Sequence, residues 1–299
     1  MPYRIKRNEP VRKAARRIVR EQLDRAVDEA RDRHRAADDR VHQLRARIKR
    51  ARAALRLVRA NGHLRGRARR DDRWMRDVAR SLARARDATV EAETLRRLTE
   101  RFGHEVPRLR ETLTRVDERV SRRQSGPRMA GHLGEAVQAL RRVNDDFGHW
   151  RVHSGRRAVE RGIRIAYRKA RRLARELRVD DPPEQFHGWR KSVKRLGYQL
   201  RLLREAAPEL WWTLGAPLER LGELLGDAHD LASLQAHVGA EPQLFGGSAE
   251  RKALMAVLER EGAALQAEAR ALGAEVLSAR PREVAARVDR AWRAWRHRR

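Results

Sequence analysis

The residues best suited to chemistry form two rows, each headed by a histidine. In the first row, cations follow His42 at i+3, i+7, i+10 and i+14, namely Arg45, Lys49, Arg52 and Arg56. This spacing places the row on one face of a helix, beside an apolar stripe, over a length of about 21 Å. Guanidinium, ammonium and imidazole groups in such a row can donate hydrogen bonds to successive phosphate oxygens. The pattern therefore indicates a surface for an extended anion.

The second row repeats the first at a constant offset of 145 residues. The segment HQLRARIKRA from His42 aligns with HGWRKSVKRL from His187, and the apolar stripe follows the same offset. The polar residues of the second row are His187, Arg190, Lys191, Lys194, Tyr198 and Arg201. Downstream, LARARD ending at Asp87 aligns with LGDAHD ending at Asp230 at an offset of 143. Two matched signatures in the same order indicate a duplicated unit, with halves of 1–150 and 151–299.

Both rows lie in windows without acidic residues. Residues 41–70 contain eleven Lys or Arg, and residues 186–204 contain six, without one Asp or Glu. Each like-charge pair at helical spacing costs about 0.2–0.5 kcal/mol, and ordinary surface helices relieve this repulsion with interspersed acids. The chain also carries a net charge of +30, which a mutational bias toward Arg does not explain. The pattern therefore favours a polyanionic partner over a solvated basic face.

The two row-heading histidines have three interpretations. A metal site is disfavoured because each histidine stands alone in its motif among arginines, whose charge opposes a cation. A buried structural histidine and a histidine that contacts phosphate both remain open, and the second is favoured. Asp87 and Asp230 have no nucleophile or second carboxylate at a useful spacing. We expect each aspartate near a helix junction, where it orients a basic side chain, and we expect no catalysis, cofactor or bound metal.

Helices are the elements that must position these rows. Apolar residues recur with helical periodicity, and breaks are marked by pairs such as Asn61-Gly62 and Gly126-Pro127. The predicted helices cover residues 10–36, 39–60, 71–87, 88–102, 106–124, 129–148, 156–178, 183–206, 209–227, 230–238, 248–278 and 282–298. This order predicts an all-α fold of two four-helix bundles, one from each half, related by a pseudo-two-fold axis.

The composition excludes several classes of protein. Cysteine is absent, so there is no disulfide framework, no Cys-ligated zinc and no thiol nucleophile. No apolar run approaches the length of about 18 residues that a membrane-spanning helix needs. The basic N-terminal residues are not followed by an apolar segment, so we expect no secretory signal and a cytoplasmic location.

At its first motif the sequence resembles the CHAD family, the conserved histidine α-helical domain. The family pattern H-x-x-R-V-x-x-R-R-L-R corresponds to HQLRARIKRAR, with Ala46 and Ala51 in place of Val and Leu. The family segment LG-x-x-RD looks like LARARD, which ends in Arg86-Asp87. The two alanines change packing and leave the charges of the row in place.

The second half resembles the same family. The pattern H-x-x-R-K-x-x-K-R-L-R-Y corresponds to HGWRKSVKRLGY, with Gly197 in place of Arg. The segment LG-x-x-ND looks like LGDAHD, in which His229 replaces Asn. GIRIAYRKARR from Gly162 to Arg172 is similar to the family's preceding helix. The missing cation at Gly197 leads us to expect a smaller contribution from this half.

The resemblance implies two pseudo-symmetric bundles that bind inorganic polyphosphate at a basic surface between them. It also implies an association with polyphosphate granules. Carried over residue by residue, the binding residues are His42, Arg45, Lys49, Arg50, Arg52, His187, Arg190, Lys191, Lys194, Arg195 and Tyr198. Arg168 and Arg171 are added on the preceding helix, and Arg56 and Arg201 continue the two rows.

A nucleic-acid-binding helical bundle is the alternative function. It fits the charge equally well, but the sequence lacks a recognisable reading helix, RNP sequence or zinc finger. A polyphosphate-processing enzyme is a third possibility, opposed by the missing P-loop lysine motif and the missing carboxylate cluster for Mg²⁺. The sequence therefore predicts a non-enzymatic binding module for inorganic polyphosphate.

Overall fold

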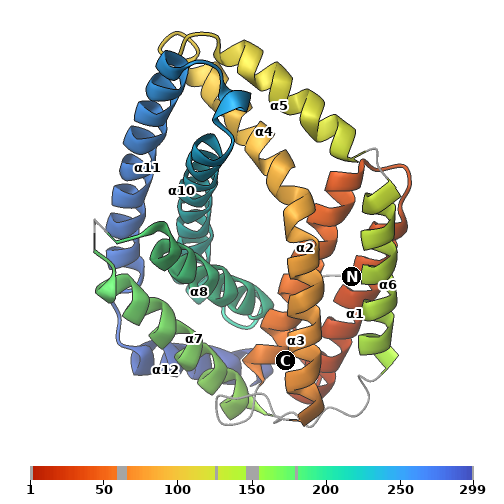
Figure 1. The fold of residues 1–299 in the computed structure, drawn as a ribbon. Coiled ribbons are helices and arrows are strands. Elements are labelled where there is room, and N and C mark those ends of the chain that lie inside the picture. Colours follow the sequence, from red (N-terminus) through yellow and green to blue (C-terminus); the bar gives the residue numbers. More distant parts are fainter. Residues whose placement is uncertain (1–2, 59–65, 125–126, 146–154, 179–180, 298–299) are drawn as a thin grey trace.

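The structure, a computed structural model, describes residues 3–58, 66–124, 127–145, 155–178 and 181–297, and every regular element within them is a helix (Figure 1). The first half contains α1 (Val11–Arg31), α2 (Ala37–Leu57), α3 (Gly66–Ser81), α4 (Ala83–Phe102), α5 (Leu109–Gln124) and α6 (Pro127–Asp145). The second half contains α7 (Arg156–Glu176), α8 (Pro183–Leu202), α9 (Pro208–Leu210), a π-helical turn (Trp211–Gly215), α10 (Ala216–Ala240), a 3₁₀ turn (Pro242–Phe245), α11 (Ser248–Val276) and α12 (Pro281–His297). The predicted all-α fold class is confirmed.

Most predicted helix boundaries lie within a few residues of the observed ones. At the start of α7, Gly155 adopts a φ of 108°, which residues with a side chain rarely adopt, and the helix begins at the next residue as predicted. Two predicted breaks are wrong. The break expected after Asp87 lies at Leu82, and α10 continues through the break expected before Asp230. The predicted breaks at Asn61-Gly62 and Gly126 lie outside the described residues.

The larger hydrophobic core joins the two halves of the chain. It is built from α1, α2, α3 and α6 of the first half and from α7, α8, α12 and the start of α10 of the second. Both predicted apolar stripes lie in it, and all their members are buried, namely Leu44, Ile48, Ala51, Leu55, Val58, Trp189, Val193, Leu196, Leu200 and Leu203. At the centre, the buried Gln199 of α8 donates its Nε2 hydrogen to the Ala53 carbonyl oxygen of α2 at 3.1 Å. The two repeated helices are therefore in direct contact.

A smaller core lies where α4 and α5 meet α10 and α11. Its residues run from Ala92 to Val120 in the first half and from Leu231 to Leu258 in the second. The side chains of His237 on α10 and Glu91 on α4 bridge the two halves at its edge. In Figure 1 the loop between α4 and α5 lies at the top of the view, beside the start of α11. Since both cores draw on both halves, the arrangement as one four-helix bundle per half is not confirmed.

One glycine fixes how closely α7 approaches α2. A Cβ atom added at Gly162 would lie 2.1 Å from the carbonyl oxygen of Leu57, at the last residue of α2. Gly162 is itself buried in the larger core region. The backbones of the two helices therefore touch at this point, and this contact sets the position of α2 beside its neighbours.

We expect the substitution Gly162→Ala to lower the free energy of unfolding by about 1–3 kcal/mol, because the added methyl group overpacks the contact with Leu57. The matched control is Gly262→Ala in the middle of α11, where an added Cβ meets no atom within 4 Å. That change should raise the free energy of unfolding by about 0.5–1 kcal/mol, because alanine loses less backbone entropy in a helix. Urea unfolding of both variants checks the prediction. A change in the free energy of unfolding with the same sign in both variants would contradict it.

Candidate anion-binding site

The two predicted rows meet where α8 lies against α2. Helix α8 contacts α2, α7 and α10, and its apolar stripe is buried, so its polar residues lie along the edges of these contacts. Lys49 of α2 lies close enough to His187 of α8 for its charge to help lower the pKa of that histidine. Both helices are central in Figure 1. The structure therefore brings the head of the second row, His187, near the middle of the first row at Lys49.

The cations of α8 repel one another. Burial lowers the pKa of Lys194, and the charge of Arg190 lowers it further. Burial also lowers the pKa of Lys191, with contributions from Arg190 and from Arg80 of α3. Among the described residues, neither lysine nor Arg190 has a carboxylate oxygen within 4.0 Å of its charged group. No direct ion pair among the described residues therefore offsets the repulsion between these three side chains.

Four buried polar atoms of α8 have no hydrogen-bond partner among the described residues. They are Nδ1 of His187, Nε1 of Trp189, Nε of Arg190 and Oε1 of Gln199, and the first and third belong to predicted site residues. Buried nitrogen atoms of this kind normally make a hydrogen bond, and leaving one unmade costs about 1–3 kcal/mol. Nε of Arg190 and Nδ1 of His187 therefore keep hydrogen-bonding capacity beside the cations of α8.

Two glycines of α10 make room for the cations of α8. Gly222 and Gly226 are four residues apart and therefore share one face of the helix. A Cβ at Gly222 would lie 3.3 Å from Cγ of Lys194, and one at Gly226 would lie 3.6 Å from Nε of Arg190. The two cationic side chains therefore lie directly across the α10 backbone.

The two aspartates of the repeated motifs lie near the arginines of the two rows. Desolvation raises the pKa of Asp87, and the charge of Arg45 lowers it. Desolvation likewise raises the pKa of Asp230, against which the charge of Arg190 acts most strongly. Their predicted role in orienting these arginines remains a prediction. Asp87 lies in the second turn of α4, near the α3–α4 junction at Leu82 as predicted. Asp230 lies in the middle of α10, so its predicted place near a junction is corrected.

The two repeated motifs that end in Asp87 and Asp230 lie where a long helix passes from one core to the other. Leu82, just before α4, belongs to the larger core and Ala92 of α4 to the smaller one, with Asp87 between them. In α10, Leu225 belongs to the larger core and Leu231 to the smaller one. The segment between those two leucines contains Gly226, His229 and Asp230. The candidate site therefore borders the boundary between the two cores.

The sequence did not single out His229 as a site residue. Its ring lies against that of His187, with 4.2 Å between the ring centroids and 34° between the ring planes. The motif LGDAHD contained the signal, because it departs from the family pattern at this residue. The contact itself depends on how α8 packs against α10, which the sequence does not display. Arg80 on α3 was missed for the same reason.

Arg52 and Arg56 are held by an internal carboxylate. Nε of Arg52 lies 3.0 Å and Nε of Arg56 2.9 Å from Oδ1 of Asp72, which projects from α3. Burial by itself raises the pKa of Asp72, but the two guanidinium groups outweigh it and hold the pKa below its ordinary value. The end of the first row is therefore neutralised in part, although its spacing continues that of His42 and Lys49.

Other predicted residues also have protein partners. Arg201 lies 3.3 Å from Glu219 and stacks over Trp211. Arg171 donates from Nε to the carbonyl oxygen of Leu277 at 3.0 Å, beside a groove of about 690 Å³ between α7 and α11. Arg171 thus contributes to folding between α7 and α11, whereas Arg201 lies near enough to Arg50 of α2 for its charge to help lower the pKa of that guanidinium.

The remaining predicted residues are spread along α2, α7 and α8. His42, Lys49 and Arg168 are exposed, and Arg45 and Arg195 are half-buried. His42, Lys49, Arg45 and Arg195 all make interactions within the protein. The hydroxyl of Tyr3 donates to the Arg50 carbonyl oxygen, and burial lowers the pKa of the Arg50 guanidinium. Burial also raises the pKa of Tyr198, which lies near Arg50. The side chain of Arg86 lies outside the described residues.

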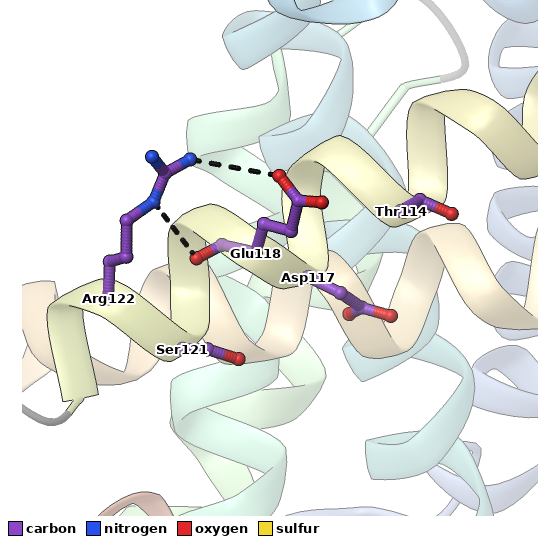
Figure 2. A pocket seen from close by; sticks show the side chains of 5 residues that line it. All are labelled: Thr114, Asp117, Glu118, Ser121 and Arg122. Atoms are coloured by element: carbon purple, nitrogen blue, oxygen red, sulfur yellow. Dashed lines mark hydrogen bonds and ion pairs between the residues drawn. The ribbon is translucent and has the colours of Figure 1, made fainter.

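A separate pocket on α5 has a different chemical character. Figure 2 shows this pocket of about 560 Å³, lined by Thr114, Asp117, Glu118, Ser121 and Arg122. Nη2 of Arg122 lies 3.9 Å from a carboxylate oxygen of Glu118, one turn away. Acidic side chains thus outnumber the basic one, and the pocket does not suit a polyanion.

Comparisons with known proteins identify one family. The family described as CHAD domain matches residues 17–239 of the chain. No curated protein matches the chain. Over the described residues, no three His, Asp or Glu side chains are grouped so as to hold a metal ion. Over the same residues, no helix has both the length and the apolar character needed to cross a membrane.

We expect Asp72→Asn to lower the free energy of unfolding by about 3 kcal/mol, because it leaves the partly buried Arg52 and Arg56 without their counter-charge. Asp77→Asn is the matched control on the same helix, since its pair with Arg76 is exposed and should be worth less than about 1 kcal/mol. Chemical denaturation measures both. Equal losses for the two variants would contradict the structural role assigned to Asp72.

We also expect the free protein to lose stability as the pH falls from about 7 to about 5. Burial and the neighbouring cations lower the pKa of His187 and of His229 to about 4. The unfolded chain takes up these protons near the ordinary value of about 6.5, so stability is full above that pH and decreases toward about 4. Melting temperatures measured across this range test the expectation. The variant His187→Asn/His229→Asn should show a flatter profile, and an unchanged profile would refute the assignment.

Proposed function

The chain belongs to the CHAD family, and from this premise we propose that it binds inorganic polyphosphate, without cleaving it, where α2 and α8 meet. The single observation that carries the proposal is the group of cations on α8, Arg190, Lys191 and Lys194, which lack direct carboxylate partners among the described residues. A bound polyanion would replace their mutual repulsion by attraction. It would also supply acceptors for the buried nitrogens of Arg190 and His187.

Inorganic polyphosphate fits this surface by its chemistry. It is a flexible chain with regularly spaced negative charges and no bases to be recognised. A guanidinium fork pairs with two phosphate oxygens at once, while an ammonium group acts as a point charge. Arg190 with its neighbours Lys191 and Lys194 offers both kinds of contact within two turns of one helix. Binding would displace counter-ions, so affinity would fall steeply with salt.

The proposal takes the two halves as pseudo-two-fold copies. An offset of 145 carries α1 onto α7 with the same bounds, Val11–Arg31 and Arg156–Glu176. The contacts of α1 with α2 and α6 recur as contacts of α7 with α8 and α12, and α4 meets α5 as α10 meets α11. These correspondences support a duplication in which each half contributes one row. Polyphosphate would then lie across both rows and touch both halves.

The predicted residues have different roles in the proposed binding. The central contacts come from Lys49, His187, Arg190, Lys191 and Lys194. Arg45, Arg50, Arg195, Tyr198 and His42 extend the surface along α2 and α8. Arg52, Arg56, Arg171 and Arg201 are held by protein groups and serve mainly the fold. Arg168 lies exposed on α7 as an outer contact. Binding of this kind would bring the protein to polyphosphate granules.

We expect Lys49→Glu/Lys191→Glu to weaken binding of long-chain polyphosphate by at least about tenfold, because each change removes one charge-assisted contact and adds repulsion. The slope of log affinity against log salt should become shallower by about 1.4, taking two lost contacts and the value for single-stranded polyanions. Both lysines are exposed, so the fold should tolerate the changes. Fluorescence anisotropy over a salt series measures both quantities.

The matched control is Lys13→Glu/Lys252→Glu, which makes the same charge change at exposed lysines of α1 and α11. This variant should keep most of the affinity if the site is local. Equal losses in both variants would mean that net charge alone attracts the polymer, and the proposed site would be rejected. Single-stranded RNA with the same number of phosphates should fail to displace polyphosphate near physiological salt. Release of phosphate in the presence of Mg²⁺ or Mn²⁺ would overturn the non-enzymatic part.

A further inference from the structure

The stacked pair of His187 and His229 is the most unusual cluster in the described structure. The two rings come from different helices, α8 and α10, and their centroids are 4.2 Å apart. Both rings are half-buried. Nδ1 of His187 is buried and has no hydrogen-bond partner among the described residues. A ring contact of this kind in an otherwise cationic surface is not needed to hold α8 against α10, because Val193, Leu196 and the leucines of α10 already do so.

Cations surround the pair from several helices. The charged and titratable groups described around it are Glu184, Arg190 and Lys191 on α8, Lys49 on α2, Arg80 on α3, Arg97 on α4, and Asp227 and Asp230 on α10. Among them, Arg97 is paired with Asp227 at 2.9 Å, and Asp230 lies near both Arg190 and Lys194. Glu184 is the one acid with a distinct effect on His187. The net field at the rings is therefore positive, and the free protein keeps both rings neutral.

We infer that His229 is a further residue of the anion site, and that the His187–His229 pair takes up one proton from the solvent when polyphosphate binds. The inference rests on the proposed function. A phosphate that contacts Arg190 and Lys191 cancels the charges that oppose protonation of the rings. The imidazolium formed then donates a charge-assisted hydrogen bond to a phosphate oxygen. The site thus holds polyphosphate more tightly in mildly acidic solution and releases it more readily above neutral pH.

The size of the effect follows from proton linkage. In the free protein, burial and neighbouring cations lower the pKa of each ring to about 4. If the bound polymer restores the ordinary value of about 6.5 for one ring, affinity should rise about tenfold between about pH 7.5 and about pH 5.5. The two rings are too close for both to carry a charge, so the expected uptake is one proton per site.

The experiment measures affinity for long-chain polyphosphate at these two pH values and at constant ionic strength. Calorimetry in two buffers with different ionisation enthalpies counts the protons taken up at about pH 5.5. The wild-type chain should bind about tenfold more tightly at the lower pH and take up about one proton. The variant His187→Asn/His229→Asn should show little pH dependence and little uptake, because asparagine is polar and does not titrate. His104→Asn is the control at an exposed histidine after α4 and should behave as the wild type.

The outcomes separate this inference from the proposed function. Binding that is strong and salt-dependent but insensitive to pH would overturn the inference and leave the proposed function in place. A double variant that keeps the wild-type pH dependence would also overturn it. No binding at either pH would reject both. A titration of the two histidines by NMR, in wild-type protein with and without polyphosphate, tests the same proton uptake without any substitution.

Discussion

Repulsion among the cations at the α2–α8 contact is the constraint that the rest of the structure accommodates. Each like-charge pair costs a few tenths of a kcal/mol on a helix surface, and more when water is partly excluded. Burial of one large apolar side chain stabilises by about 1.5–3 kcal/mol. The two stripes of α2 and α8 bury Leu44, Ile48 and Leu55 on one side and Trp189, Val193 and Leu196 on the other. Apolar burial on the inner faces therefore outweighs the repulsion on the edges, and the cations stay close together because the core holds their helices there.

The structure divides the cations of the two rows into two groups with different effects. Arg52 and Arg56 share Asp72, and Arg201 lies beside Glu219, so these arginines cross-link helices. Arg190, Lys191 and Lys194 have no carboxylate within ion-pair distance in the part of the chain that is described. The first group contributes to folding and is costly to disturb, whereas the second remains available to an external anion. A count of charge in the sequence adds both groups together, whereas the proposed binding of a polyanion rests on the second group alone.

The sequence predicted the helices and the inner faces well, because helical periodicity and Gly or Pro breaks are local signals. The apolar stripe from Leu44 to Val58 is buried as expected, and α7 begins at the predicted residue. Contacts between elements far apart in the chain could not be predicted from these local signals. Asp72 lies twenty residues beyond Arg52, outside the acid-free window, so the row appeared free of counter-charge along its whole length. His229 became visible as a partner of His187 only through the packing of α10 on α8. Helix α10 also continued past the break predicted between residues 227 and 230.

The place of the site between the two cores links binding to the arrangement of the whole molecule. Helix α10 has Leu225 in the larger core and Leu231 in the smaller one, and α4 makes the same passage between Leu82 and Ala92. The basic residues of α8 lie against α10 at this passage, so an anion bound there would attract side chains on both sides of it. A ligand that binds only the folded chain adds stability by mass action, about 2.7 kcal/mol when its concentration is a hundred times the Kd. In this protein the added stability would act on the segment that holds the two cores together, because the relieved repulsion is located there. Changes that weaken binding of the polyanion should therefore also remove its stabilising effect on the contact between the two cores. A binding surface on a single helix face would not couple these two quantities.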